Sequence, residues 1–446
     1  MKYVRQHAHK FTCGRVSGYK AAYTLPVFVT VVIISLWINT CHLQCLGLAH
    51  VVLLTKLVFL LAVHELLRPF CLSFRDVCIL TAHVGSAANV AILQFVRRGL
   101  HPKFLEWTIW YEWFQAIAFA AGQRNGGHIL KMPNALAFRR NFELIGRLMG
   151  AWACLRHGNE LESFRYNGLE HLWLRSRSNN KKTTNNKRRI VMLYYHGGGY
   201  ALFSPRFFVE FANRLLTQVQ SQLRAVCQES DSSMDVQILL ANYRKLPEVC
   251  FPTPLDDAMA MFDYLVKHEK VSPRNIIIAG DSAGGGLVLA TLLRLRRTGR
   301  EMPLAALCSC PYADLSSDVV VSEHCYISKS MLDAIRDLCV QTTPRSLWCE
   351  GAMLQTDLRG LPPLFIQTAE FDILHKQSLQ LAKNAQSGGV HVELDVHEHM
   401  PHVFTLFPHF IMPQSSVGIE RLAAFVLRQV TAYQVPVQLP MAAPAF

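Results

Sequence analysis

The stretch that most constrains the fold runs from Asn275 to Gly286 and reads Asn-Ile-Ile-Ile-Ala-Gly-Asp-Ser-Ala-Gly-Gly-Gly. A strand-like run of isoleucines leads into Gly280-Asp-Ser-Ala-Gly284, and a leucine-rich helical pattern follows. A strand, a G-x-S-x-G turn and a helix in this order predict a nucleophile elbow, which exposes the serine hydroxyl. We expect Ser282 to be strained, at the positive end of the helix. On the pentapeptide alone, a tight turn with an ordinary surface serine is the alternative.

A second glycine run supports the elbow interpretation. The segment 190–195 reads as a strand and ends in His196-Gly-Gly-Gly-Tyr200. Glycines let backbone N–H groups face a ligand with no Cβ in the way. The run lacks the spacing and the lysine of a phosphate-binding P-loop. Together with the elbow it predicts an oxyanion hole, whose donors stabilise the charge that builds up on a carbonyl oxygen during acyl transfer. The expected donors are the backbone N–H groups of Gly197, Gly198, Gly199 and Ala283.

Short apolar strands and amphipathic helices alternate from residue 190 onward. This alternation predicts an α/β fold with a mainly parallel central sheet that is covered by helices on both faces. The expected strands are 190–195, 236–241, 275–279, 304–310, 363–368 and 390–396, and the expected helices are 207–226, 255–269, the one after the elbow, 376–386 and 416–430.

An acid and a histidine follow the serine in the order that a Ser-Asp-His triad on this architecture requires. Asp372 comes soon after the strand 363–368, and His402 comes soon after the strand 390–396. Loops at the carboxyl edge of a parallel sheet converge, so we expect Ser282, Asp372 and His402 to meet there. His402 would accept the serine proton, and Asp372 would orient the imidazole.

Alternatives to this assignment remain open from the sequence. Glu370 could be the acid in place of Asp372. His397, His399 and His402 could bind a metal, although no Cys or carboxylate pattern of the kind found in zinc sites accompanies them. Cys308 and Cys310 form a C-x-C pair with no second pair at zinc-ribbon spacing, which favours core packing.

The N-terminal hundred residues look like a membrane-anchoring region, 1–100. The run 21–38 carries no charged residue, follows a basic segment and has nearly the length that spans a bilayer. A second apolar run, 46–63, contains Lys56, and a third, 77–96, is uncharged but holds several polar residues. One or three spans would place the remainder in the lumen, and two would place it in the cytosol. A cleaved signal peptide is the rival for the first run.

Composition fits such an arrangement, with 51% hydrophobic and only 17% charged residues and a net charge of +13. Charge of this sign favours anionic lipid as a partner and says little about fold. We expect 101–174 to form a helical cap or interface segment, 175–189 a basic loop, 190–434 the catalytic domain and 435–446 a tail. Aromatic residues between Trp107 and Phe114 are typical of a membrane interface or of a helical cap.

From residue 190 to the C-terminus the chain resembles the hormone-sensitive-lipase-like family of α/β-hydrolases, the alpha/beta hydrolase fold-3 group. The matching segments, in the family's order, are His196-Gly-Gly-Gly-Tyr200, Asn242-Tyr-Arg-Lys-Leu-Pro-Glu248 with Phe251-Pro252 and Asp256-Asp-Ala258, Gly280-Asp-Ser-Ala-Gly-Gly285, Cys310-Pro-Tyr-Ala-Asp-Leu315, Asp372 and Met400-Pro-His-Val-Phe404. Three departures stand out. Lys245-Leu246 replaces the usual Leu-Ala, Asp372 lacks the usual Pro-Leu-x-Asp after it, and His399 stands where glycine is common.

The resemblance implies a serine carboxylesterase or lipase that cleaves an apolar ester through an acyl-enzyme, with Ser282, Asp372 and His402 as its triad. It implies no metal, no organic cofactor and no nucleic-acid partner. With its apolar N-terminus, the chain is most similar to membrane-bound members such as arylacetamide deacetylase, neutral cholesterol ester hydrolase and fungal steryl acetyl hydrolase. We therefore expect it in a membrane, that of the endoplasmic reticulum. An amidase on the same triad and a non-catalytic receptor for a small ligand are the alternatives. A chain beginning near Phe164 is expected to keep turnover of small soluble esters.

Overall fold

The computed structural model describes residues 48–177, 188–226, 234–315, 322–342 and 353–432. The chain divides into two units, Met1–Glu65 and Leu66–Phe446. The described part of the first unit belongs to a helix, α2 (Leu48–Leu67), whose last two residues are counted in the second unit. It coincides with most of the expected second apolar run, 46–63. The expected first span, 21–38, and the tail, 435–446, lie outside the described residues.

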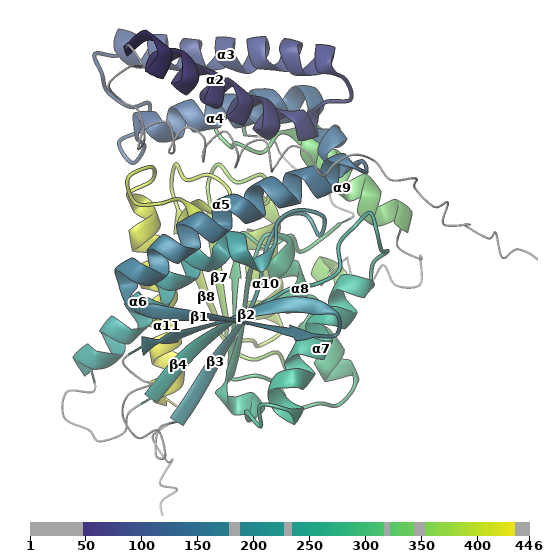
Figure 1. Ribbon diagram of the computed structural model, residues 1–446. Helices are drawn as coiled ribbons and strands as arrows, with labels where there is room; N and C mark the ends of the chain where they lie inside the picture. Colours follow the sequence, from purple (N-terminus) through teal and green to yellow (C-terminus); the bar gives the residue numbers. More distant parts are fainter. Residues whose placement is uncertain (1–47, 178–187, 227–233, 316–321, 343–352, 433–446) are drawn as a thin grey trace, which may run out of the picture. The chain divides into compact units, whose positions relative to one another are not determined.

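The second unit is built on an eight-stranded sheet (Figure 1). The strands are β1 (Asn159–Tyr166), β2 (Leu169–Ser176), β3 (Arg188–Tyr195), β4 (Met234–Ala241), β5 (Ile276–Asp281), β6 (Ala305–Ser309), β7 (Leu364–Ala369) and β8 (Val392–His397). Their order across the sheet is β1-β2-β4-β3-β5-β6-β7-β8. From β4 to β8 all neighbours pair in parallel, whereas β1 and β2 are antiparallel to each other and β2 is antiparallel to β4. The expected mainly parallel sheet is confirmed.

The sheet begins earlier in the chain than the sequence analysis placed it. We expected the segment 101–174 to be helical and the sheet to start at 190, but β1 and β2 occupy 159–176. Asn167 and Gly168 join these strands with positive φ angles of 50° and 76°, the backbone of a two-residue hairpin turn. Phe164 therefore lies inside β1, and a chain that starts there would lose most of an edge strand. The expected basic loop is shorter too, because its ends belong to β2 and β3 and its centre lies outside the described residues.

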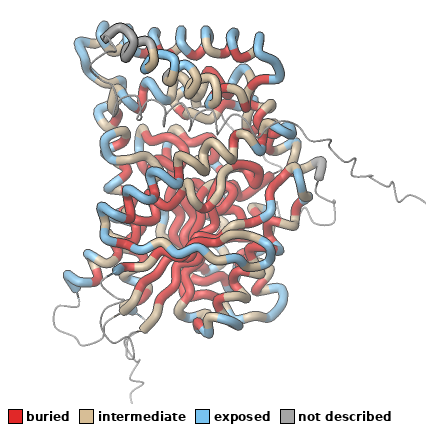
Figure 2. Tube along the Cα trace, in the orientation of Figure 1, coloured by how far each residue is buried: buried red, intermediate tan, exposed pale blue. Residues whose placement is uncertain are grey.

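Helices cover both faces of the sheet, as the alternation predicted. On one face lie α6 (Val209–Val226) and α11 (Gln414–Ala432), and on the other lie α7 (Thr253–Lys267), α8 (Ala283–Arg297) and α10 (His375–Ser387). Successive side chains of β3 point to opposite faces of the sheet. Met192 packs in the cluster with α6 and α11, whereas Val191 and Leu193 pack in the cluster with α7, α8 and α10. The central strands are buried on both sides (Figure 2).

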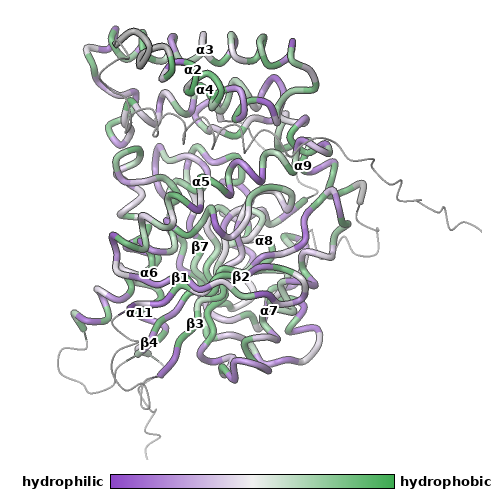
Figure 3. Tube along the Cα trace, viewed as in Figure 1, coloured by the Kyte–Doolittle hydropathy of each residue, from purple (hydrophilic) through white to green (hydrophobic). Residues whose placement is uncertain are grey.

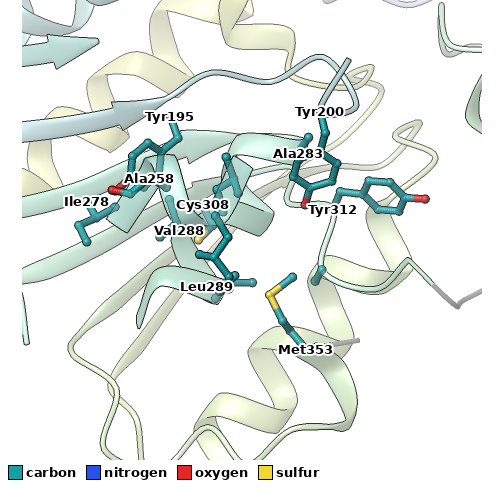
Figure 4. Close-up of a cluster of buried hydrophobic side chains, with 14 of the residues drawn as sticks. Tyr195, Tyr200, Ala258, Ile278, Ala283, Val288, Leu289, Cys308, Tyr312 and Met353 are labelled. Atoms are coloured by element: carbon teal, nitrogen blue, oxygen red, sulfur yellow. The ribbon is translucent and has the colours of Figure 1, made fainter. Parts of the chain in front are cut away.

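The start of α8 is embedded in the larger of these clusters (Figure 4). Ala283, Val288 and Leu289 of this helix are fully or almost fully buried, in the same cluster as Tyr195 and Tyr312. Because this helix begins at the residue after Ser282, tight packing of its first two turns fixes where the serine sits.

Four further α-helices lie in the described part of the second unit. They are α3 (Phe74–Arg97), α4 (Ile109–Asn125), α5 (Asn134–His157) and α9 (Lys329–Thr342). In this part of the chain α4 packs against both α3 and α9, and α5 packs against α6. Among the described residues α3 is long and apolar enough to cross a membrane, although by length and composition alone. It covers the expected third apolar run, 77–96. The sequence analysis did not predict α9.

Candidate active site

Ser282 lies in a strained turn between β5 and α8. Its φ is 50° and its ψ is −121°, a conformation that non-glycine residues adopt only where the surroundings impose it. The neighbouring glycines are the reason that the turn closes. A Cβ on Gly280 would lie 2.5 Å from the carbonyl oxygen of Gly284, and one on Gly284 would lie 2.0 Å from that of Tyr195. The backbone geometry is that of the predicted elbow.

The residue before the serine connects the elbow to the glycine run. The Asp281 carboxylate accepts a hydrogen bond from the Gly197 N–H at 3.0 Å and another from the Tyr194 hydroxyl at 2.6 Å. Burial raises the pKa of Asp281 to about 6, against the lowering effect of these two donors. The sequence offered a signal for this contact that we did not use, namely an acid at the end of an apolar strand.

This contact changes the expected set of oxyanion donors. Gly197 already donates its N–H to Asp281, so it is not available to a substrate. Gly198 and Gly199 follow with positive φ angles of 112° and 60°. Within the described part of the chain, the N–H groups of Gly198, Gly199 and Ala283 donate to no protein acceptor. Three of the four expected donors therefore remain.

The predicted acid and histidine are in direct contact. Asp372 follows β7 and His402 follows β8, so both lie beyond the carboxyl ends of neighbouring strands. The Nδ1 atom of His402 is 2.7 Å from Oδ1 of Asp372, and both side chains are almost fully buried. Glu370, the rival acid, is exposed and accepts a hydrogen bond from the His399 N–H instead. The geometry therefore favours Asp372 over Glu370.

The other histidines of this segment each face a different partner. His397 contacts Asp395 at 2.8 Å, and His399 contacts Glu106 at 3.2 Å. They do not form the metal cluster with His402 that the sequence left open. His391 is largely exposed, and His409 contacts the hydroxyl of Ser416.

One set of possible metal ligands exists among the described residues, formed by Cys310, Asp372 and His402, with ligand atoms within 4.8 Å of one another. The pKa of the Cys310 thiol is raised well above its usual range, mainly because the thiol is buried and also because the negative charge of Asp372 lies nearby. Metals bind the thiolate, so a thiol kept protonated is a poor ligand. The same thiol sulfur accepts a hydrogen bond from the Val403 N–H at 3.3 Å. Cys310 is thus a packing residue beside the acid, and the expected core role of this cysteine fits the structure.

Comparison with known proteins agrees with this geometry. Residues 192–406 match the model of a family described as alpha/beta hydrolase fold. The matched region runs from β3 to the loop after β8 and includes Ser282, Asp372 and His402. Among curated relatives, an acetyl-hydrolase of Streptomyces hygroscopicus is 33% identical over 195 residues, which cover 42% of this chain and 64% of the relative. A carboxylesterase of Mycobacterium tuberculosis is 30% identical over 210 residues, covering 44% of this chain and 64% of the relative.

A solved structure of an esterase from the bacterial hormone-sensitive lipase family is similar to this hydrolase-fold chain as well. It superposes with a TM-score of 0.54 at 28% identity, over 66% of this chain and 92% of that one. The curated relatives are matched over a smaller part of their length. This chain spans about half to two thirds of the length of the acetyl-hydrolase above and of two further relatives. These similarities show the α/β-hydrolase fold.

Two departures from the family pattern acquire a structural meaning. Lys245 is buried, and its ammonium group donates to Oδ1 of Asn242 at 2.5 Å and to the carbonyl of Tyr243 at 2.9 Å. The pKa of Lys245 is lowered to about 7, mainly because the group is buried and also because the positive charge of Arg139 lies nearby. The pKa of His196 is held well below its usual range, mainly by burial of the imidazole and secondly by the positive charge of Lys245. His196, which stacks on the Tyr243 ring, is therefore neutral at the base of the glycine run.

The second departure, His399, is held by a segment that lies far upstream in the sequence. Its φ is 57°, in the region that favours glycine. The indole Nε1 of Trp107 donates to the His399 carbonyl at 2.7 Å, and the Phe104 ring stacks on the imidazole with centroids 4.7 Å apart. Glu106 contacts its Nδ1. These residues support the loop that carries His402.

The aromatic run around Trp107 divides into two groups. Residues 159–432, which hold the sheet, its connecting loops and its covering helices, are called the catalytic unit below. Trp107 and Tyr111 are buried against this catalytic unit, whereas Trp110, Trp113 and Phe114 are exposed. The sequence analysis treated the run as one aromatic segment and did not predict the contact with His399. A single tryptophan in an aromatic run carries no signal of its partner nearly three hundred residues away.

Proposed function

We propose that the protein is a serine carboxylesterase that hydrolyses apolar esters through an acyl-enzyme. One observation carries the proposal. The buried contact between His402 and Asp372 lies at the same edge of the sheet as the strained turn that presents Ser282. Support from outside the structure comes from relatives named esterase, acetyl-hydrolase and carboxylesterase.

The reaction would begin when the hydroxyl of Ser282 attacks the ester carbonyl carbon and passes its proton to Nε2 of His402. Asp372 would hold the imidazole by its Nδ1–H and stabilise the cation that forms. The N–H groups of Gly198, Gly199 and Ala283 would stabilise the oxyanion. The imidazolium then protonates the departing alcohol. Water, activated by the same histidine, attacks the acyl-enzyme and releases the acid.

The surroundings of His402 favour an apolar substrate. Tyr326 has its ring centroid 6.5 Å from the imidazole, and it packs in turn on Phe407 and Phe114. Burial raises the pKa of Tyr326 far above its usual range, so this ring stays uncharged. Aromatic surfaces of this kind contribute area for apolar contact but few hydrogen bonds. An ester with apolar acyl or alcohol parts therefore suits this aromatic surface better than a charged ester does.

A panel of p-nitrophenyl esters of increasing acyl length, run beside the matching anilides, tests this function. We expect the full-length wild type in detergent to turn over the esters and Ser282→Ala to lose essentially all of this turnover. Ser416→Ala, which alters an exposed hydroxyl on α11, serves as the matched control and should behave as wild type. Faster turnover of the anilides would favour the amidase alternative. If Ser282→Ala retained wild-type ester turnover, the assignment of the nucleophile would be wrong.

A non-catalytic receptor on the same fold is the second alternative. The close contact of His402 with Asp372 speaks against it, because a receptor has no need of an oriented base. Binding of an ester with no turnover by the wild type would favour the receptor.

We also propose that the protein resides in a membrane, that of the endoplasmic reticulum. The uncharged run 21–38 and the similarity to membrane-bound members of the family support this location. The full-length protein should stay in the membrane pellet during alkaline carbonate extraction. Its release by carbonate would exclude a membrane span.

A further inference from the structure

Helix α3 presents two different faces. The buried residues Val77, Leu80, Val84, Ala88 and Ala91 recur every three or four positions and form one stripe, as expected for a helix that packs on a neighbour. That neighbour is α4. The opposite face is exposed, yet no Asp, Glu, Lys or Arg occurs from 77 to 96. Figure 3 shows apolar and hydrophilic residues following one another along this helix, and the hydrophilic ones between 77 and 96 are His, Asn, Gln, Ser and Thr.

The partner helix, α4, is fixed to the catalytic unit at both of its ends. At its start, the Thr108 hydroxyl donates to the Ile411 carbonyl at 2.6 Å, and the Tyr111 hydroxyl donates to the His324 carbonyl at 3.2 Å. At its other end, Gly122 and Gly126 approach the segment from Ser328 to Met331 so closely that a Cβ would collide. Helix α4 therefore lies flat on the catalytic unit.

The packing of α3 on the fixed helix α4 restricts the orientation that α3 can take in a bilayer. Packed helices have axes about 8–10 Å apart, so α3 follows α4 at that distance. Helix α3 has 24 residues, roughly 36 Å at 1.5 Å per residue, and could span a hydrocarbon core of about 30 Å by length. A crossing α3 would carry α4 and its polar neighbours into the hydrocarbon, among them the ion pair of Arg98 with Glu112. Charged groups there are costly.

We propose that α3 lies in the plane of an anionic membrane surface and does not cross the membrane, with its exposed face in the lipid. Apolar side chains on that face include Ile79, Val90, Leu93 and Val96. Interfacial helices bury such a face to a depth of about 5–10 Å. The inference assumes the membrane association proposed above, but it does not depend on ester hydrolysis.

The chemistry at the edges of this surface matches anionic phospholipid. Arg75 and Arg97 are exposed and flank the uncharged part of α3. Near the start of α4, Trp110 and Trp113 are exposed, 59% and 40% respectively, and tryptophan favours the headgroup level. Basic residues and a net charge of +13 attract an anionic surface. The same charge repels a second copy of the chain, which is the other possible occupant of this face.

Depth measurement along one face of α3 tests the orientation directly. An environment-sensitive fluorescent amino acid is introduced by amber suppression at Ile79, Ser86 or Leu93 of the full-length chain. Steps of seven residues keep the three exposed positions on one face, about 10 Å apart along the axis. The protein is reconstituted in phosphatidylcholine–phosphatidylserine vesicles that contain lipids brominated at different depths. A probe at Leu379, on α10 of the catalytic unit, is the control.

We expect the three probes to report the same shallow depth and the control to remain unquenched. Depths that differ by about 10 Å between neighbouring positions would show a crossing helix and overturn the proposal. No quenching at any of the three positions would overturn it as well, because α3 would then not touch lipid. These outcomes stand whether or not the protein hydrolyses esters.

A charge on the same face provides a second test. Leu93→Glu should lower turnover of an ester dissolved in the vesicle bilayer several-fold and leave turnover of a short soluble ester unchanged. Leu379→Glu, which adds the same charge at an exposed leucine of α10, should change neither rate. If Leu93→Glu left the rate on the bilayer ester at the wild-type value, the face would have no role at the membrane.

Discussion

The loops that carry Ser282 and His402 lie at the same edge of the sheet, but they are held in place by different means. The serine turn is fixed from within, by glycines that admit no side chain and by the buried contact of Asp281 with Gly197. The histidine loop is also fixed from outside, by Trp107, Phe104 and Glu106, which precede the sheet in the chain. One half of the site therefore depends on local sequence, and the other depends on a distant segment.

The difference predicts how each half responds to substitution. A change in the serine turn meets rigid backbone and should threaten the fold itself. A change in the supporting segment removes a contact from a loop that remains connected to β8, so it should lower catalysis and leave the fold standing. The following predictions are ordered from the largest expected effect to the smallest.

Gly284→Ala should give little or no folded protein, because the added Cβ would lie 2.0 Å from the carbonyl oxygen of the fully buried Tyr195. The yield of monodisperse protein in detergent and its thermal unfolding provide the measurement. Gly85→Ala in α3 is the matched control, since a Cβ there meets nothing within 4 Å. A Gly284→Ala protein as stable as wild type would contradict the steric account of the elbow.

Asp372→Asn should lower kcat on a soluble ester by a factor of about a thousand or more, because the amide no longer stabilises the correct tautomer and the cation of His402. Glu370→Gln should change kcat less than threefold, since this exposed acid accepts a backbone hydrogen bond that an amide oxygen can also accept. Steady-state kinetics on both variants decide the matter. A larger loss at Glu370 than at Asp372 would reverse the assignment of the acid.

Asp281 should leave a signature in the pH dependence of stability. Its pKa is about 6 in the folded protein and about 3.9 when unfolded, so between these values the folded state binds more protons. Its contribution to the free energy of unfolding is complete below about pH 4 and is lost as the pH rises through 6. Two pKa units correspond to roughly 3 kcal/mol.

Asp281→Asn keeps a carbonyl oxygen for Gly197 and Tyr194 but does not titrate. The free energy of unfolding of this variant minus that of wild type should therefore rise by roughly 2 kcal/mol from pH 4 to pH 6, and by roughly 3 kcal/mol over the whole titration from below pH 3 to above pH 7. Urea denaturation of both proteins in the same detergent, at a series of pH values, measures this difference. A difference that does not change with pH would mean that Asp281 is not the buried, titrating carboxyl described above.

Trp107→Phe should lower kcat about tenfold with little change in KM, because the ring remains but the hydrogen bond to the His399 carbonyl is lost. Thermal unfolding should change by only a few degrees. Trp110→Phe, at an exposed position three residues later in the chain, is the control and should match wild type. An unchanged kcat in Trp107→Phe would show that the upstream segment does not position the histidine loop.

The same difference explains which features the sequence allowed us to predict. The strands from β3 to β8 and the serine turn follow local patterns, and the predicted strand 236–241 differs from β4 (Met234–Ala241) by two residues. The β1–β2 hairpin carried a local signal as well, Asn167-Gly168 between alternating segments. We missed it because the upstream region had been assigned to a helical cap.

The contacts of the histidine loop had no local signal. His399 was recognised as a departure from glycine, but its stacking partner Phe104 lies 295 positions earlier. The loss of Gly197 as an oxyanion donor also depends on a pairing, in this case with Asp281 across the elbow. Pairings between distant segments follow from topology and packing, which a single sequence does not display.

The account rests on Ser282 as the nucleophile, and a covalent label tests this most directly. The full-length protein is treated with a fluorophosphonate, digested and analysed by mass spectrometry. We predict that a single serine is modified, Ser282, directly after β5. The Asp372→Asn variant should be labelled more slowly than wild type, because its base is misoriented. A label on another residue, or no label on a protein that still hydrolyses esters, would contradict the account.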